Sequence, residues 1–170
     1  MHRGMYIYIY RATLKTEMKM FYCPLRRERA LFFGGIKMAD KKLKPREQAF
    51  IITFEKLFNP ELTVDEIVQN AGECESVTLN GKAANMAKGI DANIEEIDKL
   101  IENNLRGWSK SRISKVALAV LRLGVYELKI AEKPAPVGVI ISEAVNICKD
   151  YGSEEDKSFV NGVLGSVSRS

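Results

Sequence analysis

A hydrophobic repeat close to 3.6 residues runs through nearly the whole chain after residue 38, where strand-type alternation is absent. The first repeat begins at Lys44-Pro45, and proline suits a first helical turn. Its apolar stripe consists of Phe50, Phe54, Leu57 and Phe58. Five further helices are expected at residues 63–72, 79–104, 109–128, 139–150 and 153–170. The sequence therefore predicts an all-α domain of about six helices.

Polar residues mark several of the expected helix ends. Thr63 and Glu66 have the spacing of a capping box, and Ser109 or Ser111 is expected to cap the fourth helix. Ser153 is expected to cap the sixth helix. Asn161-Gly162 falls inside that helix, although both residues disfavour helix, so we interpret the pair as a joint packed against a neighbouring helix.

The positive charge of the chain is confined to its beginning. The 170 residues carry a net charge of +4, yet residues 1–37 hold eight Lys or Arg and only two acids. The other 133 residues, with 18 basic and 20 acidic side chains, are therefore close to neutral. Any polyanion site on the helical part must be a local patch. Three widely spaced cysteines (Cys23, Cys74 and Cys148) and the lack of a membrane-length apolar run favour a cytoplasmic protein with reduced thiols.

Residues 1–37 differ from the rest of the chain in composition. Residues 6–10 could form a short strand, for which no partner strand is expected. The codons for residues 33–37 could form a bacterial ribosome-binding site ahead of Met38. We therefore expect residues 1–37 to be translated upstream DNA and residues 38–170 to be the functional domain. The alternative is a genuine basic extension that binds RNA or lipid.

Enzyme signatures are absent from the sequence. The single histidine, His2, leaves little for acid–base or metal chemistry, and no phosphate-binding glycine loop or hydrolase motif occurs. The acidic runs at Glu95-Glu96 and at residues 154–156 are interpreted as a solvated face and a helix N-terminus. No catalytic residue, metal site or cofactor is expected.

Two basic clusters are candidates for binding phosphates. The first contains Lys41, Lys42, Lys44 and Arg46. The second, in a stretch without acids, contains Arg106, Lys110, Arg112, Lys115 and Arg122. Such clusters are explained equally well as charged side chains that are simply solvated and bind no phosphate. Phe54 and Tyr151 could stack on unpaired bases, although Phe54 fits the core stripe better.

Four motifs in the C-terminal half give the chain a family resemblance. WSxxRI (residues 108–113), VLRLxxYEL (120–128), PxxVxIxEA (136–144) and FVNGVL (159–164) occur in this order. Together they resemble the NusB family of bacterial transcription antitermination factors, over about residues 41–167. The resemblance implies two stacked three-helix bundles and no enzyme activity. It also implies binding of single-stranded boxA RNA in nascent ribosomal RNA together with NusE, action on RNA polymerase, and in some members a homodimer.

The resemblance also assigns candidate RNA-binding residues. The family's first helix begins with an RNA-contacting basic run, which Leu43 and Pro45 dilute here. Ser142, Ser158 and Ala117 also depart from the family pattern. The weaker basic surface suggests modest RNA affinity alone and more dependence on NusE. The candidates are Lys41, Lys42, Lys44, Arg46, Phe54, Tyr151, Glu155 and Lys157.

Two other functions stay open from the sequence. NusB-like domains also form the N-terminal part of some RNA cytosine methyltransferases, but 170 residues leave no room for their cofactor-binding domain. The other function is that of a helical protein-interaction scaffold with weak or lost RNA binding. The interruption of the basic run by Leu43 and Pro45 favours this alternative.

Overall fold

The computed structural model describes residues 8–11, 18–21, 32–33, 36–37, 43–72, 79–105 and 112–170. The chain divides into two compact units. The first contains two antiparallel hairpins, in which β1 (Tyr8–Arg11) pairs with β2 (Met18–Phe21) and β3 (Phe32–Phe33) pairs with β4 (Ile36–Lys37). Tyr8 lies opposite Phe21. The expectation that a strand near residues 6–10 has no partner was wrong, because β2 follows it within the same segment.

The second unit is helical, as the periodicity predicts. Its helices are α1 (Pro45–Lys56), α2 (Val64–Gly72), α3 (Gly81–Ala92), α4 (Ile94–Asn103), α5 (Lys115–Lys129), α6 (Val137–Tyr151) and α7 (Glu154–Val167). The last turns of α2 are grouped with the first unit. No helix in the described ranges is long and apolar enough to cross a membrane.

The long helix expected at residues 79–104 is two helices, which is why the described residues form seven helices rather than about six. The break falls at Asn93, whose backbone leaves the helical region (φ −117°, ψ 24°). The Asn93 side-chain amide donates a hydrogen bond to the Gly89 carbonyl at 2.8 Å. Asparagine competes in this way with the backbone ladder, which disfavours a continuous helix.

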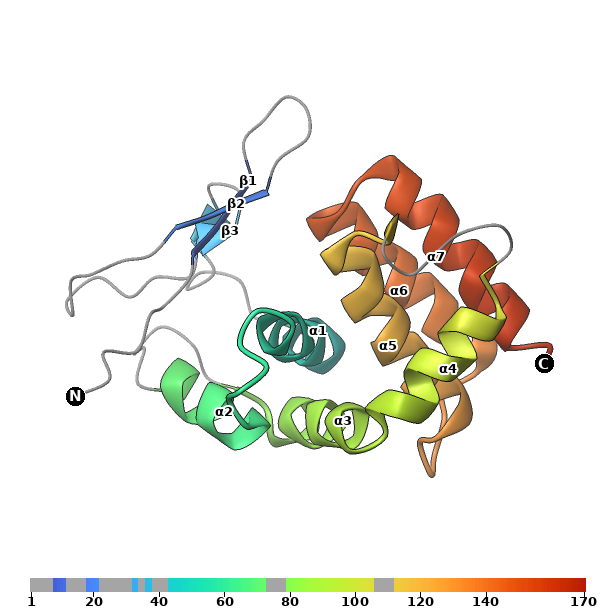
Figure 1. Cartoon of the computed structure of the whole chain (residues 1–170), viewed down its shortest axis with the longest axis horizontal. Helices are drawn as coiled ribbons and strands as arrows, with labels where there is room; N and C mark the ends of the chain where they lie inside the picture. Colours follow the sequence, from blue (N-terminus) through green and yellow to red (C-terminus); the bar gives the residue numbers. More distant parts are fainter. Residues whose placement is uncertain are drawn as a thin grey trace. The chain divides into compact units, whose positions relative to one another are not determined.

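Helix α5 is the centre of the helical unit. It packs against α1, α3, α4, α6 and α7, and every residue from 116 to 121 is buried. Helices α5, α6 and α7 contact one another as a three-helix bundle, and α1 and α3 pack together and against α5 (Figure 1). Helix α4 contacts both α5 and α7. Helix α5 therefore joins the two groups of helices.

Two of the three helix caps expected from the sequence are present in the structure. Thr63 and Glu66 form the expected capping box, and Ser153 forms another with Asp156 at the start of α7. Ser109 and Ser111, the caps expected from the sequence, lie outside the described residues. Ser114 caps α5 instead, and its hydroxyl accepts a hydrogen bond from the Ala117 N–H at 3.0 Å.

Two glycines in helices have opposite surroundings. A Cβ on Gly124 of α5 would lie 2.7 Å from the Leu164 Cδ1 atom of α7, so the two helices meet closely there. A Cβ on Gly162 would meet nothing within 4 Å, and both Asn161 and Gly162 are exposed. The interpretation of Asn161-Gly162 as a packed joint was therefore wrong, and the close approach in this bundle occurs at Gly124.

Alanine at these two glycines is expected to change stability in opposite directions. Gly124→Ala should lower the free energy of unfolding by about 1–3 kcal/mol, because Leu164 is fully buried and cannot move aside freely. Gly162→Ala should raise it by up to about 1 kcal/mol, because alanine favours helix and fits the open space. Urea denaturation of the two variants measures both changes. Equal effects would contradict this account of the α5–α7 contact.

Candidate nucleic-acid interface

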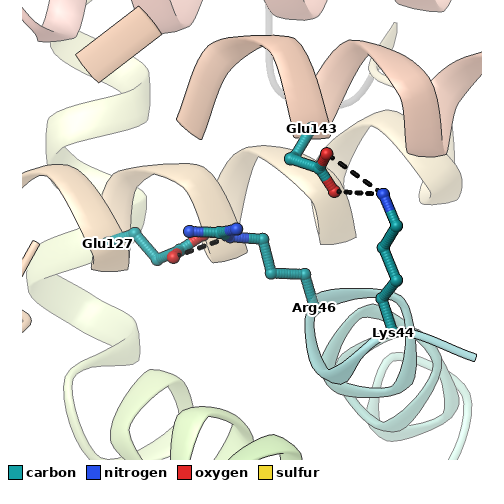
Figure 2. A network of polar contacts seen from close by, with 4 residues as sticks. All are labelled: Lys44, Arg46, Glu127 and Glu143. Atoms are coloured by element: carbon teal, nitrogen blue, oxygen red, sulfur yellow. Dashed lines mark hydrogen bonds and ion pairs between the residues drawn. The ribbon is translucent and has the colours of Figure 1, made fainter. Parts of the chain in front are cut away.

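The start of α1 holds two candidate cations that face acidic residues of the C-terminal bundle. Lys44 is the N-cap residue of α1, and Arg46 lies in its first turn. Figure 2 shows Arg46 extending to Glu127 of α5 and Lys44 extending to Glu143 of α6. The sequence separations are 81 and 99 residues. The two pairs therefore tie the beginning of α1 to the C-terminal bundle.

Arg46 makes the more buried of the two ion pairs. Its Nε atom donates to both carboxylate oxygens of Glu127 at 2.9 Å, and the two side chains are 25% and 10% exposed. The hydrogen bond with Glu127 raises the pKa of Arg46 above its ordinary value. A partly buried pair with two hydrogen bonds exchanges its partners less readily than an exposed pair. We therefore assign Arg46 a structural role in holding α1, which limits its use as a phosphate ligand.

Lys44 makes a more exposed pair. Its Nζ atom lies 3.2 Å from the Glu143 Oε1 atom and 3.3 Å from Oε2. The Lys44 side chain is 69% exposed and that of Glu143 is 24% exposed. Exposed ion pairs are weak because water and salt screen them. Lys44 is therefore the candidate cation in the described part of α1 that can turn to a phosphate.

The two aromatic candidates are buried, so neither ring is available at the surface for stacking on a base, and their contact with RNA stays a prediction. Phe54 is 3% exposed and Tyr151 is 7% exposed. Both rings pack near Phe50, with centroids 5.8 and 5.1 Å from it. The Tyr151 hydroxyl donates to the buried carboxylate of Glu47 at 2.6 Å. Burial and the contact with Glu47 raise the pKa of Tyr151 far above its ordinary value. These rings belong to the core that holds α1 against α6.

Tyr151→Phe is expected to affect stability and leave RNA binding unchanged. The substitution keeps the ring and removes a hydrogen bond to a carboxylate, so the free energy of unfolding should fall by about 1.5–3 kcal/mol. Chemical denaturation measures the loss, and RNA titration at a temperature where both proteins are folded tests the second part. A large loss of RNA affinity in the folded variant would instead show that Tyr151 contributes to RNA binding.

The candidates at the start of α7 have different surroundings. Glu155 is exposed. The Lys157 ammonium contacts Glu154, with 2.7 Å between its Nζ atom and Oε1, and its side chain is 23% exposed. Asp156 caps the helix and accepts a hydrogen bond from the Ser114 hydroxyl. The structure therefore places Glu155 at the surface and gives Lys157 a partner within its own turn.

The second basic cluster is not a continuous patch in the described residues. Arg112 and Lys115 are exposed. Arg122 donates two hydrogen bonds to Asp98 at 2.9 and 2.8 Å and is 12% exposed, so its charge is engaged inside the fold. Four candidate cations lie outside the described residues: Lys41, Lys42, Arg106 and Lys110.

The sequence analysis missed the acidic partners of Tyr151 and Arg46, which are Glu47 and Glu127 respectively. Glu47 and Glu127 are 7% and 8% exposed. A signal existed for Glu127, since it follows a nearly uninterrupted apolar run in α5 and a buried carboxylate needs a cation or hydrogen-bond donors. The sequence does not indicate which cation it meets, because the partner lies in a different helix far along the chain.

Other parts of the helical unit offer little for ligand chemistry. A cavity of about 380 Å³ lies near the far end of α1, among residues that include Leu57, Ile90 and Lys56. The Lys56 ammonium there already donates to the carbonyls of Pro60 and Leu62. No cluster of three metal-ligating side chains occurs in the ranges that the structure describes. Cys148 is buried and unpaired, and burial raises its pKa to about 12, which makes the thiol unreactive.

The fold and the C-terminal motifs define an all-helical domain of a recognised class. The pattern of the family described as the NusB family matches residues 43–169. A transcription antitermination protein NusB of Listeria monocytogenes is 37% identical over 127 residues, which cover 75% of this chain and 95% of that protein. This chain belongs to the NusB family.

Two solved structures are similar to the helical unit. The T. maritima NusB structure matches with a TM-score of 0.62 and 34% identity, over 76% of this chain and 93% of that one. A structure of the antitermination factors NusB and NusE in complex with dsRNA matches with a TM-score of 0.62 and 28% identity, over 74% and 93%. The prediction of a NusB-like all-α fold is confirmed.

Proposed function

We propose that this protein is a transcription antitermination factor. It binds boxA-type single-stranded RNA of nascent ribosomal RNA together with a NusE-type ribosomal protein, and this complex promotes processive transcription by RNA polymerase. The observation that carries the proposal is the family match over residues 43–169, together with likeness to a NusB protein crystallised with NusE and RNA. The protein acts by binding rather than by catalysis.

The start of α1 supports an RNA-binding surface with few contacts. Lys44 is exposed on a helix end that the Arg46–Glu127 ion pair and an aromatic core hold in place. A fixed helix end presents its cation without the entropy loss of ordering a loop. Lys41 and Lys42 precede it in the sequence, and Glu155 and Lys157 at the start of α7 are proposed as further contacts. With few available cations, the RNA affinity of the protein alone should be modest and steeply salt-dependent.

The test is fluorescence anisotropy of a labelled boxA-type RNA titrated with the full chain, with and without the NusE-type protein. A scrambled RNA of equal length and charge is the matched control, because phosphate contacts alone do not distinguish sequences. The proposal predicts preferential binding of the boxA-type RNA that tightens when the partner is present. Equal affinity for both RNAs in both conditions would contradict it.

The second candidate function is that of a protein-interaction scaffold. It is favoured by the cations that are already paired with carboxylates of the same chain. Arg46, Arg122 and Lys157 all contact carboxylates within the fold. A scaffold predicts that the NusE-type protein binds equally well with and without RNA. The proposed factor predicts that RNA and partner strengthen each other's binding by the same factor, as linkage requires. Homodimerisation, measured by sedimentation, is a separate proposal for this chain.

A further inference from the structure

The two ion pairs at the start of α1 are alike in charge and unlike in burial. The Arg46–Glu127 pair has side chains that are 25% and 10% exposed, whereas those of the Lys44–Glu143 pair are 69% and 24% exposed. Both contacts of Lys44 with Glu143, at 3.2 and 3.3 Å, are longer than the 2.9 Å contacts of Arg46 with Glu127. The first pair is suited to remain closed and the second to open and close in solution.

The carboxylate of Glu143 contacts the ammonium group that a phosphate oxygen would also bind. An ammonium group has three N–H donors and no acceptor, and it binds carboxylate and phosphate oxygens by the same charge-assisted contacts. The Lys44 ammonium is directed at both oxygens of Glu143 (Figure 2). An RNA phosphate that binds Lys44 must therefore displace Glu143 or share the ammonium with it.

We infer that Glu143 is an internal competitor that masks Lys44 and releases it to an RNA phosphate. This inference rests on the proposed RNA-binding function and names a residue that regulates it. Glu143 lowers the attraction of the surface for any polyanion. It therefore suppresses non-specific phosphate binding until further contacts, from bases or from the partner protein, favour opening of the pair.

Removing the competitor has a defined consequence for RNA affinity. Glu143→Gln keeps the shape and polarity of the side chain and removes its charge. The variant is expected to bind RNA about two- to fivefold more tightly at low salt, which is the range of a weak exposed ion pair. Its affinity should also fall more steeply with salt, because an unmasked Lys44 neutralises an RNA phosphate more fully and so releases more of the cations condensed on RNA. The scrambled RNA should gain at least as much as the boxA-type RNA.

A double-mutant cycle separates masking from a general change of charge. RNA affinity is measured by anisotropy for the full-length wild type, Glu143→Gln, Lys44→Gln and the double variant, and thermal unfolding checks that each is folded. Masking predicts that Glu143→Gln tightens binding in the wild type and has little effect when Lys44 is absent. An equal gain in both backgrounds would show only a longer-range charge effect and would overturn the inference.

The remaining outcomes are also decisive. Weaker binding by folded Glu143→Gln would mean that Glu143 orients Lys44 for RNA, and unchanged binding would mean that the pair plays no part; both overturn the inference. If the wild type still binds RNA when Glu143→Gln binds more weakly or equally well, the proposed function stands and only the inference about Glu143 fails. If neither the wild type nor Glu143→Gln binds RNA, with or without the NusE-type protein, the proposed function fails and the inference with it.

Discussion

Arg46→Met is expected to lower the free energy of unfolding by about 3 kcal/mol, because it leaves the Glu127 carboxylate buried without its cation. Removal of one partner of a buried ion pair is more damaging than removal of both, since the remaining charge cannot regain water. The partial exposure of Arg46 puts the loss at the lower end of the usual range. Urea denaturation monitored by circular dichroism measures it.

The matched control is the double variant Arg46→Met with Glu127→Met. It replaces the pair by two apolar side chains of similar length and should recover most of the lost stability. If the single and double variants were equally destabilised, packing rather than charge would explain the loss. Charge reversal at both Lys44 and Arg46 would place a second carboxylate beside Glu127 and destabilise the fold, so the RNA test must use Lys44.

Phe50→Ala is the other substitution with a large expected effect. Phe50 is fully buried, and its ring centroid lies 5.1 Å from that of Tyr151 on α6 and 5.8 Å from that of Phe54. Truncation removes this contact between α1 and α6 and leaves a cavity, which should lower the free energy of unfolding by about 3–5 kcal/mol. Thermal and chemical unfolding of the variant measure the loss.

Phe58 provides the comparison on the same stripe. It is half-buried, and its ring centroid lies 5.1 Å from that of Phe54. Phe58→Ala should therefore be clearly milder, at about 1–2 kcal/mol, because less apolar area leaves water in the folded protein. Equal losses at the two positions would contradict the assignment of Phe50 as the aromatic contact that fixes α1 to the bundle.

The helices were predictable from the sequence because they depend on local patterns. The apolar repeat, the proline at residue 45 and the capping boxes at Thr63 and Ser153 act within a few residues. The break at Asn93 was missed because the repeat continues across it, and only the side-chain hydrogen bond to Gly89 shows the interruption. Gly162 was misjudged for a related reason. Low helix propensity indicates close helix packing only where a neighbour approaches, and no described atom lies within 4 Å of a Cβ at Gly162.

The candidate site was predictable only in part, because its chemistry depends on contacts between distant helices. The sequence correctly indicates which residues are basic, but it does not reveal that Arg46 and Arg122 are engaged by Glu127 and Asp98. It also presents Tyr151 as a possible stacking surface, whereas the structure directs its hydroxyl to Glu47. The division of the chain at residue 38 stays a prediction.

The most direct test of the central claim, that the start of α1 supplies a phosphate contact, is the salt dependence of RNA binding in Lys44→Gln. Lys129→Gln is the matched control, since Lys129 is exposed in the last turn of α5. The account predicts that Lys44→Gln weakens binding of the boxA-type RNA at each salt concentration. It also predicts that the slope of log K against log salt becomes shallower by up to about 0.7, while the control does not change. Wild-type affinity and slope in Lys44→Gln, with RNA still bound, would place the contact elsewhere and contradict the account.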